Sequence, residues 1–418
     1  MDNRRKYNTK RAIKSRNDYE SPLVKIRRRS SSVGCASKTK PLTMYMPIIR
    51  KPLHVTNKTK EPKESDAWRH KEVDTFTKYG VPPEIIALIM VFLPRRSLVN
   101  FILTCVRMKS IAYICPTLWD NVVLKTKNQS ETVIHSIIAK GVRNLLISEC
   151  LIERDLERIG NEYRTKIGVD RCRSNLTQLE ISCLADRPTP TDFVAHIIAR
   201  SESLVNLSIE RIPLTSDIAK AISQNKNLDK LNLCTCTNVS LAHCKMIFES
   251  CAWLRELNIS WTDIKVKEFD DVIRILPKTL ERISLSNMPS KYWTNNTSKL
   301  LINRCPNLLE LDISDIFQQT AASLISLLEG LPKLEQLHVN RLYLIDEEAL
   351  SKLPGNIVQL SAFNMITFDT KRRLQKRNSN LQVNESPLIN IARFSFDKPE
   401  EKTHRLYDLF DMRYFYRH

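Results

Sequence analysis

A short apolar pattern, with apolar residues at its first, fourth and sixth positions, recurs nine times between residues 142 and 362. The copies begin at Val142, Leu176, Leu204, Leu228, Leu254, Leu280, Leu308, Leu334 and Ile357. From Leu176 to Leu334 their starting points are 28, 24, 26, 26, 28 and 26 residues apart. A unit of this length cannot bury its own apolar side, so each unit must stack on its neighbours around one elongated core. The sequence therefore predicts a row of stacked units rather than a fold that encloses a single pocket.

The residues within and between the copies indicate the secondary structure of each unit. In an extended strand the side chains alternate between two faces, so the fourth and sixth positions should point into the core and the third, fifth and seventh towards solvent. In the unit that begins at Leu254, the outward set is Glu256, Asn258 and Ser260. The stretches between copies, such as residues 218–222, have helical spacing. The chain is therefore expected to be an α/β leucine-rich-repeat solenoid, a horseshoe with parallel strands on its concave face.

Most of the positive charge lies at the N-terminus. The chain has 65 Lys and Arg against 46 Asp and Glu, a net charge of +19. Residues 1–75 hold 20 basic and 8 acidic side chains, few aromatics and no sustained apolar period. We expect this basic arm to be disordered. Its basic runs at 4–6 and 25–29 favour a protein that is nuclear with some cytoplasmic presence, although a plain solvated linker is the alternative.

Composition argues against a membrane protein. The longest apolar run, residues 85–93, is shorter than the roughly 20 residues that span a bilayer, and charged residues open the chain where a signal peptide would be apolar. We expect a soluble intracellular protein with no membrane partner.

No pattern of catalytic or metal-binding residues is evident. Seven Gly do not form a phosphate-binding loop, and the eight His match no hydrolase or metal pattern. The eleven Cys are odd in number and irregularly spaced, and the spacing of Cys234, Cys236, His243 and Cys244 fits no common zinc site. We expect no cofactor, no metal and no catalytic residues.

Ahead of the repeats, residues 76–124 form a second apolar segment. Pro82 and Pro83 suit the first turn of a helix, where a missing N–H costs nothing. Apolar residues follow at helical spacing up to Leu93, and Pro94 ends the run. A unit of this size cannot bury so much apolar surface alone. Either the first repeats or a partner must cover it.

This segment resembles an F-box. The resemblance lies in Val81-Pro-Pro-Glu-Ile-Ile86, Leu93-Pro-Arg-Arg-Ser-Leu98, Cys105-Val-Arg107 and Leu118-Trp119, with Val81 in place of the usual Leu and Met108 in place of a frequent Trp. It implies binding to a Skp-type adaptor of a cullin-based ubiquitin ligase. By this resemblance the candidate adaptor contacts are Pro82, Ile85, Ile86, Leu93, Pro94, Leu98 and Trp119. Ordinary helical core is the alternative for each.

From about residue 80 to 395 the chain is similar to F-box/leucine-rich-repeat substrate receptors, especially the branch of S-phase kinase-associated protein two. The segments 254–261, 304–315, 381–384 and 391–393 carry this similarity. It implies that the C-terminal repeats hold a Cks-type accessory protein and a phosphorylated substrate, and that residues 388–396 fold back along the concave face. The candidate contacts are Trp261, Asp312, Asp315, Arg341 and Tyr343. The loop 286–291 lacks an Arg that the resemblance predicts.

These features predict a disordered arm at 1–75, an F-box at 76–124, about nine to ten repeats at 125–383 and a tail at 384–418. The expected function is that of a non-catalytic substrate-recognition subunit of a Skp–cullin–F-box ubiquitin ligase, acting on a phosphorylated cell-cycle regulator such as a cyclin-dependent-kinase inhibitor. A repeat scaffold outside any ligase and a nucleic-acid-binding solenoid are the alternatives. Nucleic acid is the weaker of these, because the repeat face has no basic stripe with interleaved aromatics.

Overall fold

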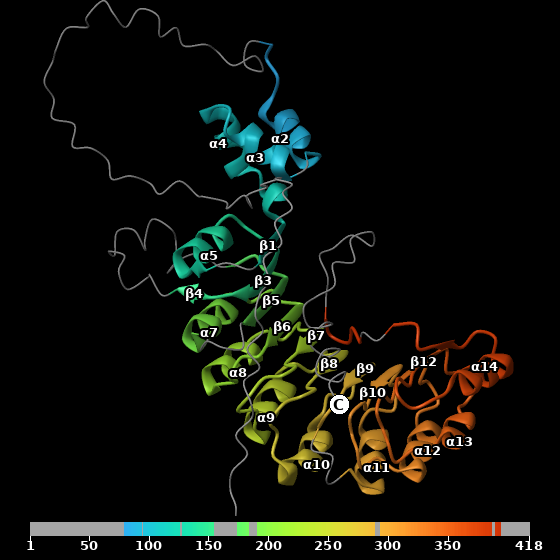
Figure 1. Ribbon diagram of the computed structural model, residues 1–418. Helices are drawn as coiled ribbons and strands as arrows, with labels where there is room; N and C mark the ends of the chain where they lie inside the picture. Colours follow the sequence, from blue (N-terminus) through green and yellow to red (C-terminus); the bar gives the residue numbers. More distant parts are fainter. Residues whose placement is uncertain are drawn as a thin grey trace, which may run out of the picture. The chain divides into compact units, whose positions relative to one another are not determined.

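The computed structural model describes residues 79–93, 95–125, 128–153, 174–183, 190–288, 293–386 and 389–393 (Figure 1). All of them belong to one compact unit, Val73–His418. The basic arm predicted for residues 1–75 lies outside the described residues, and so do Pro94 and the tail from residue 394 onward.

The first described segment is helical. It consists of α2 (Pro83–Val91), α3 (Arg95–Ile102), α4 (Val106–Ile114) and the 3₁₀ turn η2 (Pro116–Trp119). Pro82 is the N-cap of α2 and Pro83 its first residue, as the two prolines predict. The segment has a small apolar core of its own, made of Ile86, Met90, Met108, Ile111 and Ala112.

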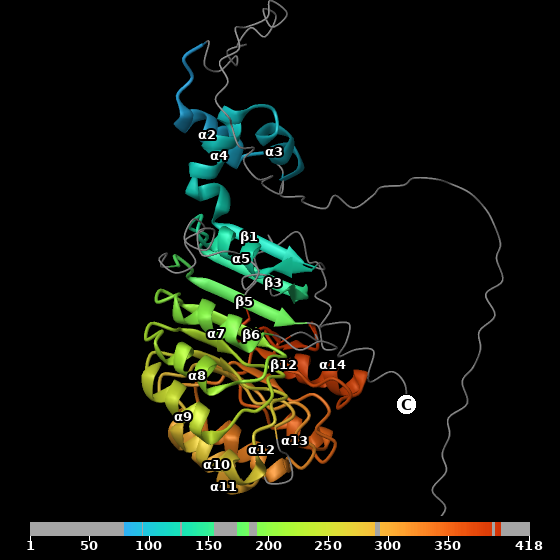
Figure 2. The same cartoon turned by 90° about the vertical axis from the view of Figure 1, so that its left-hand side faces the viewer.

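The repeats form one parallel sheet of eleven strands, in which each strand lies beside the next along the chain. The strands are β1 (Asn121–Lys125), β3 (Asn144–Cys150), β5 (Gln178–Cys183), β6 (Asn206–Glu210), β7 (Lys230–Asn232), β8 (Glu256–Asn258), β9 (Arg282–Ser284), β10 (Glu310–Asp312), β11 (Gln336–His338), β12 (Gln359–Ser361) and β13 (Gln382–Val383). Figure 2 shows β1, β3, β5 and β6 side by side. Equivalent positions are in register, so Leu231 pairs with Leu257 and Leu257 with Ile283. The predicted leucine-rich-repeat solenoid is therefore confirmed.

Helices cover one side of this sheet (Figure 1). They are α5 (Glu131–Ile138), α7 (Thr191–Ala199), α8 (Ser216–Ser223), α9 (Leu241–Ser250), α10 (Val266–Ile275), α11 (Asn295–Arg304), α12 (Ala321–Gly330), α13 (Glu347–Ser351) and α14 (Phe368–Arg377). Many begin at a capping side chain, as at Ser240, whose hydroxyl accepts a hydrogen bond from a backbone N–H of the first turn. A separate pair of short strands, β2 (Gln129–Ser130) and β4 (Ile152–Glu153), lies outside the main sheet. None of the described helices is both long and apolar enough to cross a membrane.

The core is a continuous apolar column between the sheet and the helices. The fourth and sixth positions of the repeats are fully buried, as Leu257 and Ile259 show, which confirms the predicted inward set. The ninth position of the unit, beyond the strand, is also buried in Ile212, Cys236, Met288, Ile316 and Leu342.

Trp119 connects the helical segment to the first repeats. Its ring packs against the repeat core, and its Nε1 donates a hydrogen bond to the carbonyl of Ala112 in α4 at 2.8 Å. Lys140 Nζ lies 4.0 Å from the centre of the same ring. The contacts of Trp119 are thus internal to the chain.

Candidate functional site

The concave side of the sheet carries a ladder of charges of alternating sign. Lys230 Nζ lies 2.8 Å from Glu256 Oε1. The same Glu256 oxygen lies 3.8 Å from Arg282 Nε, and Arg282 Nη1 lies 3.1 Å from Glu310 Oε2. His338 Nε2 continues the ladder at 3.0 Å from Glu310 Oε1. Lys230, Glu256, Arg282 and Glu310 occupy the third position of neighbouring units, and the strand spacing of roughly 4.8 Å brings such equivalent side chains together. His338 joins them from the fifth position of the next unit. Because basic and acidic side chains alternate, the net charge of the ladder is close to zero.

The fifth and seventh positions of the units are buried, which corrects the prediction that they face solvent. At the seventh position, Ser260, Ser314 and Asn340 are at most 4% exposed. The buried fifth positions lie within the strands. They include Asn232, Asn258, Ser284, Asp312 and His338. Ser284 Oγ donates to Asp312 Oδ2 at 2.5 Å, and the Ser314 backbone N–H donates to Asp312 Oδ1 at 2.9 Å. Burial raises the pKa of the Asp312 carboxyl, while the charge of His338 and these hydrogen bonds lower it in part. Asp312 therefore lies within the wall of the concave face, bonded to its neighbours.

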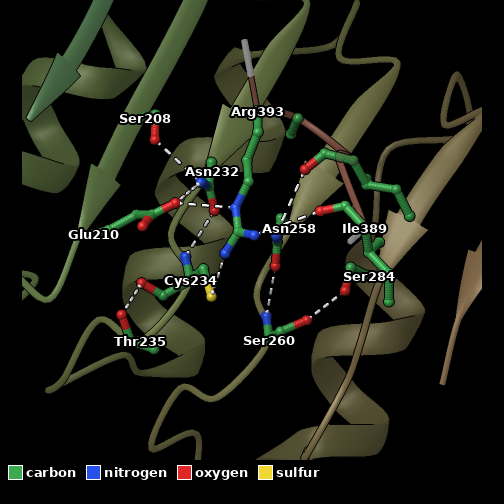
Figure 3. A network of polar contacts seen from close by, with 12 residues as sticks. Ser208, Glu210, Asn232, Cys234, Thr235, Asn258, Ser260, Ser284, Ile389 and Arg393 are labelled. Carbon is green, nitrogen blue, oxygen red and sulfur yellow. Dashed lines mark hydrogen bonds and ion pairs between the residues drawn. The ribbon is translucent and has the colours of Figure 1, made fainter. Parts of the chain in front are cut away.

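The tail covers part of this face (Figure 3). Asn258 Nδ2 lies 3.5 Å from the carbonyl oxygen of Ile391. The Ala392 N–H donates to Glu256 Oε2 at 2.9 Å. Arg393 Nε donates to Glu210 Oε1 at 3.1 Å. The same Glu210 oxygen accepts a hydrogen bond from Asn232 Nδ2 at 2.5 Å. The predicted return of the tail is thus confirmed for residues 389–393, and residues 388 and 394–396 lie outside the described residues.

Three candidate contacts occupy equivalent places just after a strand. Trp261, Asp315 and Arg341 all have φ near +60°, a conformation that costs side-chain-bearing residues about 1 kcal/mol or more. Their backbone N–H groups each donate to the carbonyl of the next unit, as Trp261 does to Ser286 at 3.0 Å. This repeated bond holds the three side chains in a row along one edge of the sheet.

The members of this row differ in exposure. Trp261 is 37% exposed, whereas Asp315 is 1% exposed. Asp315 accepts two hydrogen bonds from Arg341, from Nε at 2.5 Å and from Nη2 at 2.6 Å. The Trp261 ring is therefore accessible at the surface, while Asp315 is covered and bonded to Arg341.

Tyr343 is 62% exposed and stacks on Phe317, with ring planes 2° apart and ring centres at 6.0 Å. Phe317 was not among the candidates from the sequence. It stands two residues after Asp315, as Tyr343 stands two residues after Arg341, so the repeat spacing alone could have found it. Together these rings form an exposed aromatic platform beside the Arg341–Asp315 pair.

The candidate adaptor contacts fall into different environments. Pro82 and Ile85 are exposed, Leu93, Leu98 and Trp119 are half-buried, and Pro94 is not described. Ile86 is fully buried in the core of the helical segment, so its side chain packs beneath the exposed residues. Ile89, which shares the helical spacing, is exposed as well. The helical periodicity did not single out the other apolar side chains that are exposed here, namely Leu88, Val91, Phe92, Leu103, Val106 and Ile114.

Seven cysteines of the described part are free thiols, namely Cys105, Cys115, Cys234, Cys236, Cys244, Cys251 and Cys305. Burial raises the pKa of Cys244 to about 12 and that of Cys251 to about 11, so both are protonated thiols at neutral pH. Among the described residues no group of three His, Cys, Asp or Glu could hold a metal ion.

Residues 132–409 match the family model of the SKP2 LRR domain. The solved structures that resemble the chain include a chain of the yeast Rad7 and Elc1 complex, at 16% identity and a TM-score of 0.45, with 77% of this chain and 94% of that chain covered. They also include the leucine-rich-repeat-containing protein LegL7 from Legionella pneumophila, at 14% identity and a TM-score of 0.41, with 61% and 89% covered. Because the family model spans more than half of the chain, this protein belongs to the SKP2 LRR domain family.

Proposed function

We propose that the chain is the substrate-recognition subunit of a Skp–cullin–F-box ubiquitin ligase. The helical segment α2–α4 would act as the F-box and bind a Skp-type adaptor, which connects it to a cullin. The concave repeats would bind the substrate. The chain would contribute no catalytic residue, because its part is to raise the local concentration of substrate lysines near the ubiquitin-charged enzyme.

The observation that carries this proposal is the apolar surface of α2–α4. Ile85 is 46% exposed and Phe92 is 83% exposed, although the segment has a core of its own. Monomeric proteins rarely leave contiguous apolar patches of this kind uncovered. A partner that covers the exposed side of α2 accounts for the exposure better than packing within the chain.

On the repeat side, Trp261, Tyr343 and Phe317 offer exposed aromatic surface, which is enriched in binding hot spots. We propose that a Cks-type accessory protein binds here, together with a phosphorylated cell-cycle regulator such as a cyclin-dependent-kinase inhibitor. Because Asp315 already binds Arg341 in bidentate fashion, a phosphate would gain little from that arginine. The accessory protein would therefore supply most of the positive charge that binds the phosphate. Asp312, which is buried, would shape this surface rather than touch the partner.

We also propose that the protein is nuclear, with some cytoplasmic presence. The support for this is the basic runs at 4–6 and 25–29.

The test is direct binding of the full-length chain to a purified Skp-type adaptor. The variant carries Ile85→Glu and Phe92→Glu, which place two charges on the exposed face of α2. The matched control carries Met246→Glu and Trp253→Glu, which change two exposed apolar residues of the repeats. We expect the α2 variant to lose at least tenfold in affinity and the control to bind as the wild type does.

Unchanged binding by the α2 variant would contradict the proposed adaptor surface. If neither form binds an adaptor, the chain is a repeat scaffold outside this class of ligase. A cullin that is recovered only when adaptor and wild-type chain are both present would extend the result to the whole complex.

A further inference from the structure

The last helix of the solenoid, α14, has an unusual excess of one charge. Its ten residues include one acidic residue, Asp369, and five basic ones, Lys371, Arg372, Arg373, Lys376 and Arg377. By comparison, α10 has two basic and three acidic residues in the same length. The terminal repeats of a solenoid need a polar outer surface for solubility. Mixed charges would meet that need, so the excess of cations requires another explanation.

Two of the five cations stabilise the fold. Arg373 Nη2 lies 3.6 Å from Glu347 Oε2 on the neighbouring α13, and Arg377 donates a hydrogen bond to the Ser351 carbonyl at the end of α13. On the core side of α14, Thr370 and Leu374 are buried. The orientation of the helix about its axis is therefore determined by contacts on two sides.

The remaining side of α14 faces outward. Phe368, Arg372 and Lys376 follow one another at four-residue spacing and so share one helix face. All three are exposed, and the Phe368 ring is 78% exposed. Within the described part of the chain, neither Arg372 nor Lys376 has a hydrogen-bond or ion-pair partner. This α14 face combines an aromatic residue with two available cations.

We propose that the α14 face binds a short acidic protein segment that carries one apolar anchor residue. Carboxylates of the segment would pair with Arg372 and Lys376, and the anchor would pack on Phe368. Aromatic residues and arginine are the types most enriched at protein interfaces. The proposal does not depend on the adaptor or on the concave face, so it stands or fails separately from the proposed function.

Two observations favour a protein segment over nucleic acid. A ten-residue helix is about 15 Å long, which is short for a nucleic-acid binder that contacts on the order of 6–10 phosphates. In addition, Asp369 on α14 and Asp346 and Glu348 at α13 are exposed close by. A long phosphate backbone would have to run past these carboxylates, whereas a short peptide can contact Phe368, Arg372 and Lys376 without reaching them.

The experiment measures fluorescence anisotropy of a labelled peptide that contains one Phe followed by a run of Glu, added to the full-length chain. The test variant is Arg372→Glu with Lys376→Glu. The control is Lys267→Glu with Lys299→Glu, two exposed lysines on α10 and α11, which makes the same change in net charge. The basic arm is present in both variants, so its contribution cancels in the comparison.

We expect the α14 variant to bind the peptide about tenfold more weakly than the wild type, and the control to stay within about twofold. Phe368→Ala should weaken binding about threefold, and a peptide with Gln in place of Glu should not bind measurably. Equal losses in the two double variants would overturn the proposal, since net charge alone would then explain them. Tighter binding of oligouridylate that requires Arg372 and Lys376 would overturn the choice of a protein partner.

Discussion

Arg341 and Asp315 join two neighbouring repeats through a bidentate ion pair in which the carboxylate is buried and the guanidinium nearly so, with side-chain exposures of 1% and 19%. Arg255 and Asp229 form a pair of the same geometry, with the Nε–Oδ1 distance again 2.5 Å, but Arg255 is 56% exposed. The two pairs therefore differ in burial more than in their hydrogen bonds.

The first prediction uses this difference. Arg341→Ala leaves a buried carboxylate without its main partner, so we expect a loss of about 3 kcal/mol in the free energy of unfolding. Arg255→Ala should cost less than about 1 kcal/mol, because water replaces the exposed partner. Urea unfolding of both variants measures the two values. Equal losses would show that burial does not decide the strength of these pairs.

The second prediction concerns the docked tail. Arg393→Ala removes the cationic partner of Glu210, whose side chain is only 3% exposed, and so weakens the contact between tail and sheet. We expect hydrogen exchange of the Ala392 amide, which donates to Glu256, to become about tenfold faster. Asn390→Ala, at an exposed neighbouring position, is the control and should leave this exchange unchanged. Unchanged protection in Arg393→Ala would mean that other contacts hold the tail.

The third prediction concerns the pH dependence of stability at Asp312, whose pKa is raised by burial. A carboxyl whose pKa is higher in the folded than in the unfolded chain contributes its full stability below the unfolded pKa of about 4, and loses it as the pH rises through the folded pKa. Asp312→Asn removes this titration. The free energy of unfolding of the variant should equal that of the wild type near pH 4. At higher pH it should exceed the wild-type value by about 1 kcal/mol. A difference that is constant between pH 4 and 8, measured by thermal unfolding, would contradict this assignment.

The fourth prediction concerns close packing between α11 and α12. A Cβ at Gly330 would lie 2.5 Å from Cδ1 of Ile302, whereas a Cβ at Gly355 would have no neighbour within 4 Å. Gly330→Ala should therefore lower the free energy of unfolding by about 1–2 kcal/mol, despite the better helix propensity of Ala. Gly355→Ala should not destabilise the protein. Adding Ile302→Ala to Gly330→Ala tests the cause, because removing the clashing atoms should make the two losses less than additive.

Much of the fold could be predicted because its signals are local. The repeat length, the apolar fourth and sixth positions and the Ser, Thr or Asp that begins many helices each depend on only a few neighbouring residues. The structure confirms the inward set at Leu257 and Ile259. Even the Phe317–Tyr343 stack follows from equivalent positions one repeat apart.

The exposure of the candidate site residues could not be predicted from such local signals. Strand alternation gives the direction of a side chain from its own backbone, and Asn258 and Asp312 do point away from the helices. They are nevertheless buried, because adjacent strands bring Ser284 against Asp312 and because Ile391, 133 residues further along the chain, lies over Asn258. The burial of a side chain depends on all the groups packed around it. Contacts with distant segments do not follow the repeat period, so the sequence pattern does not show them.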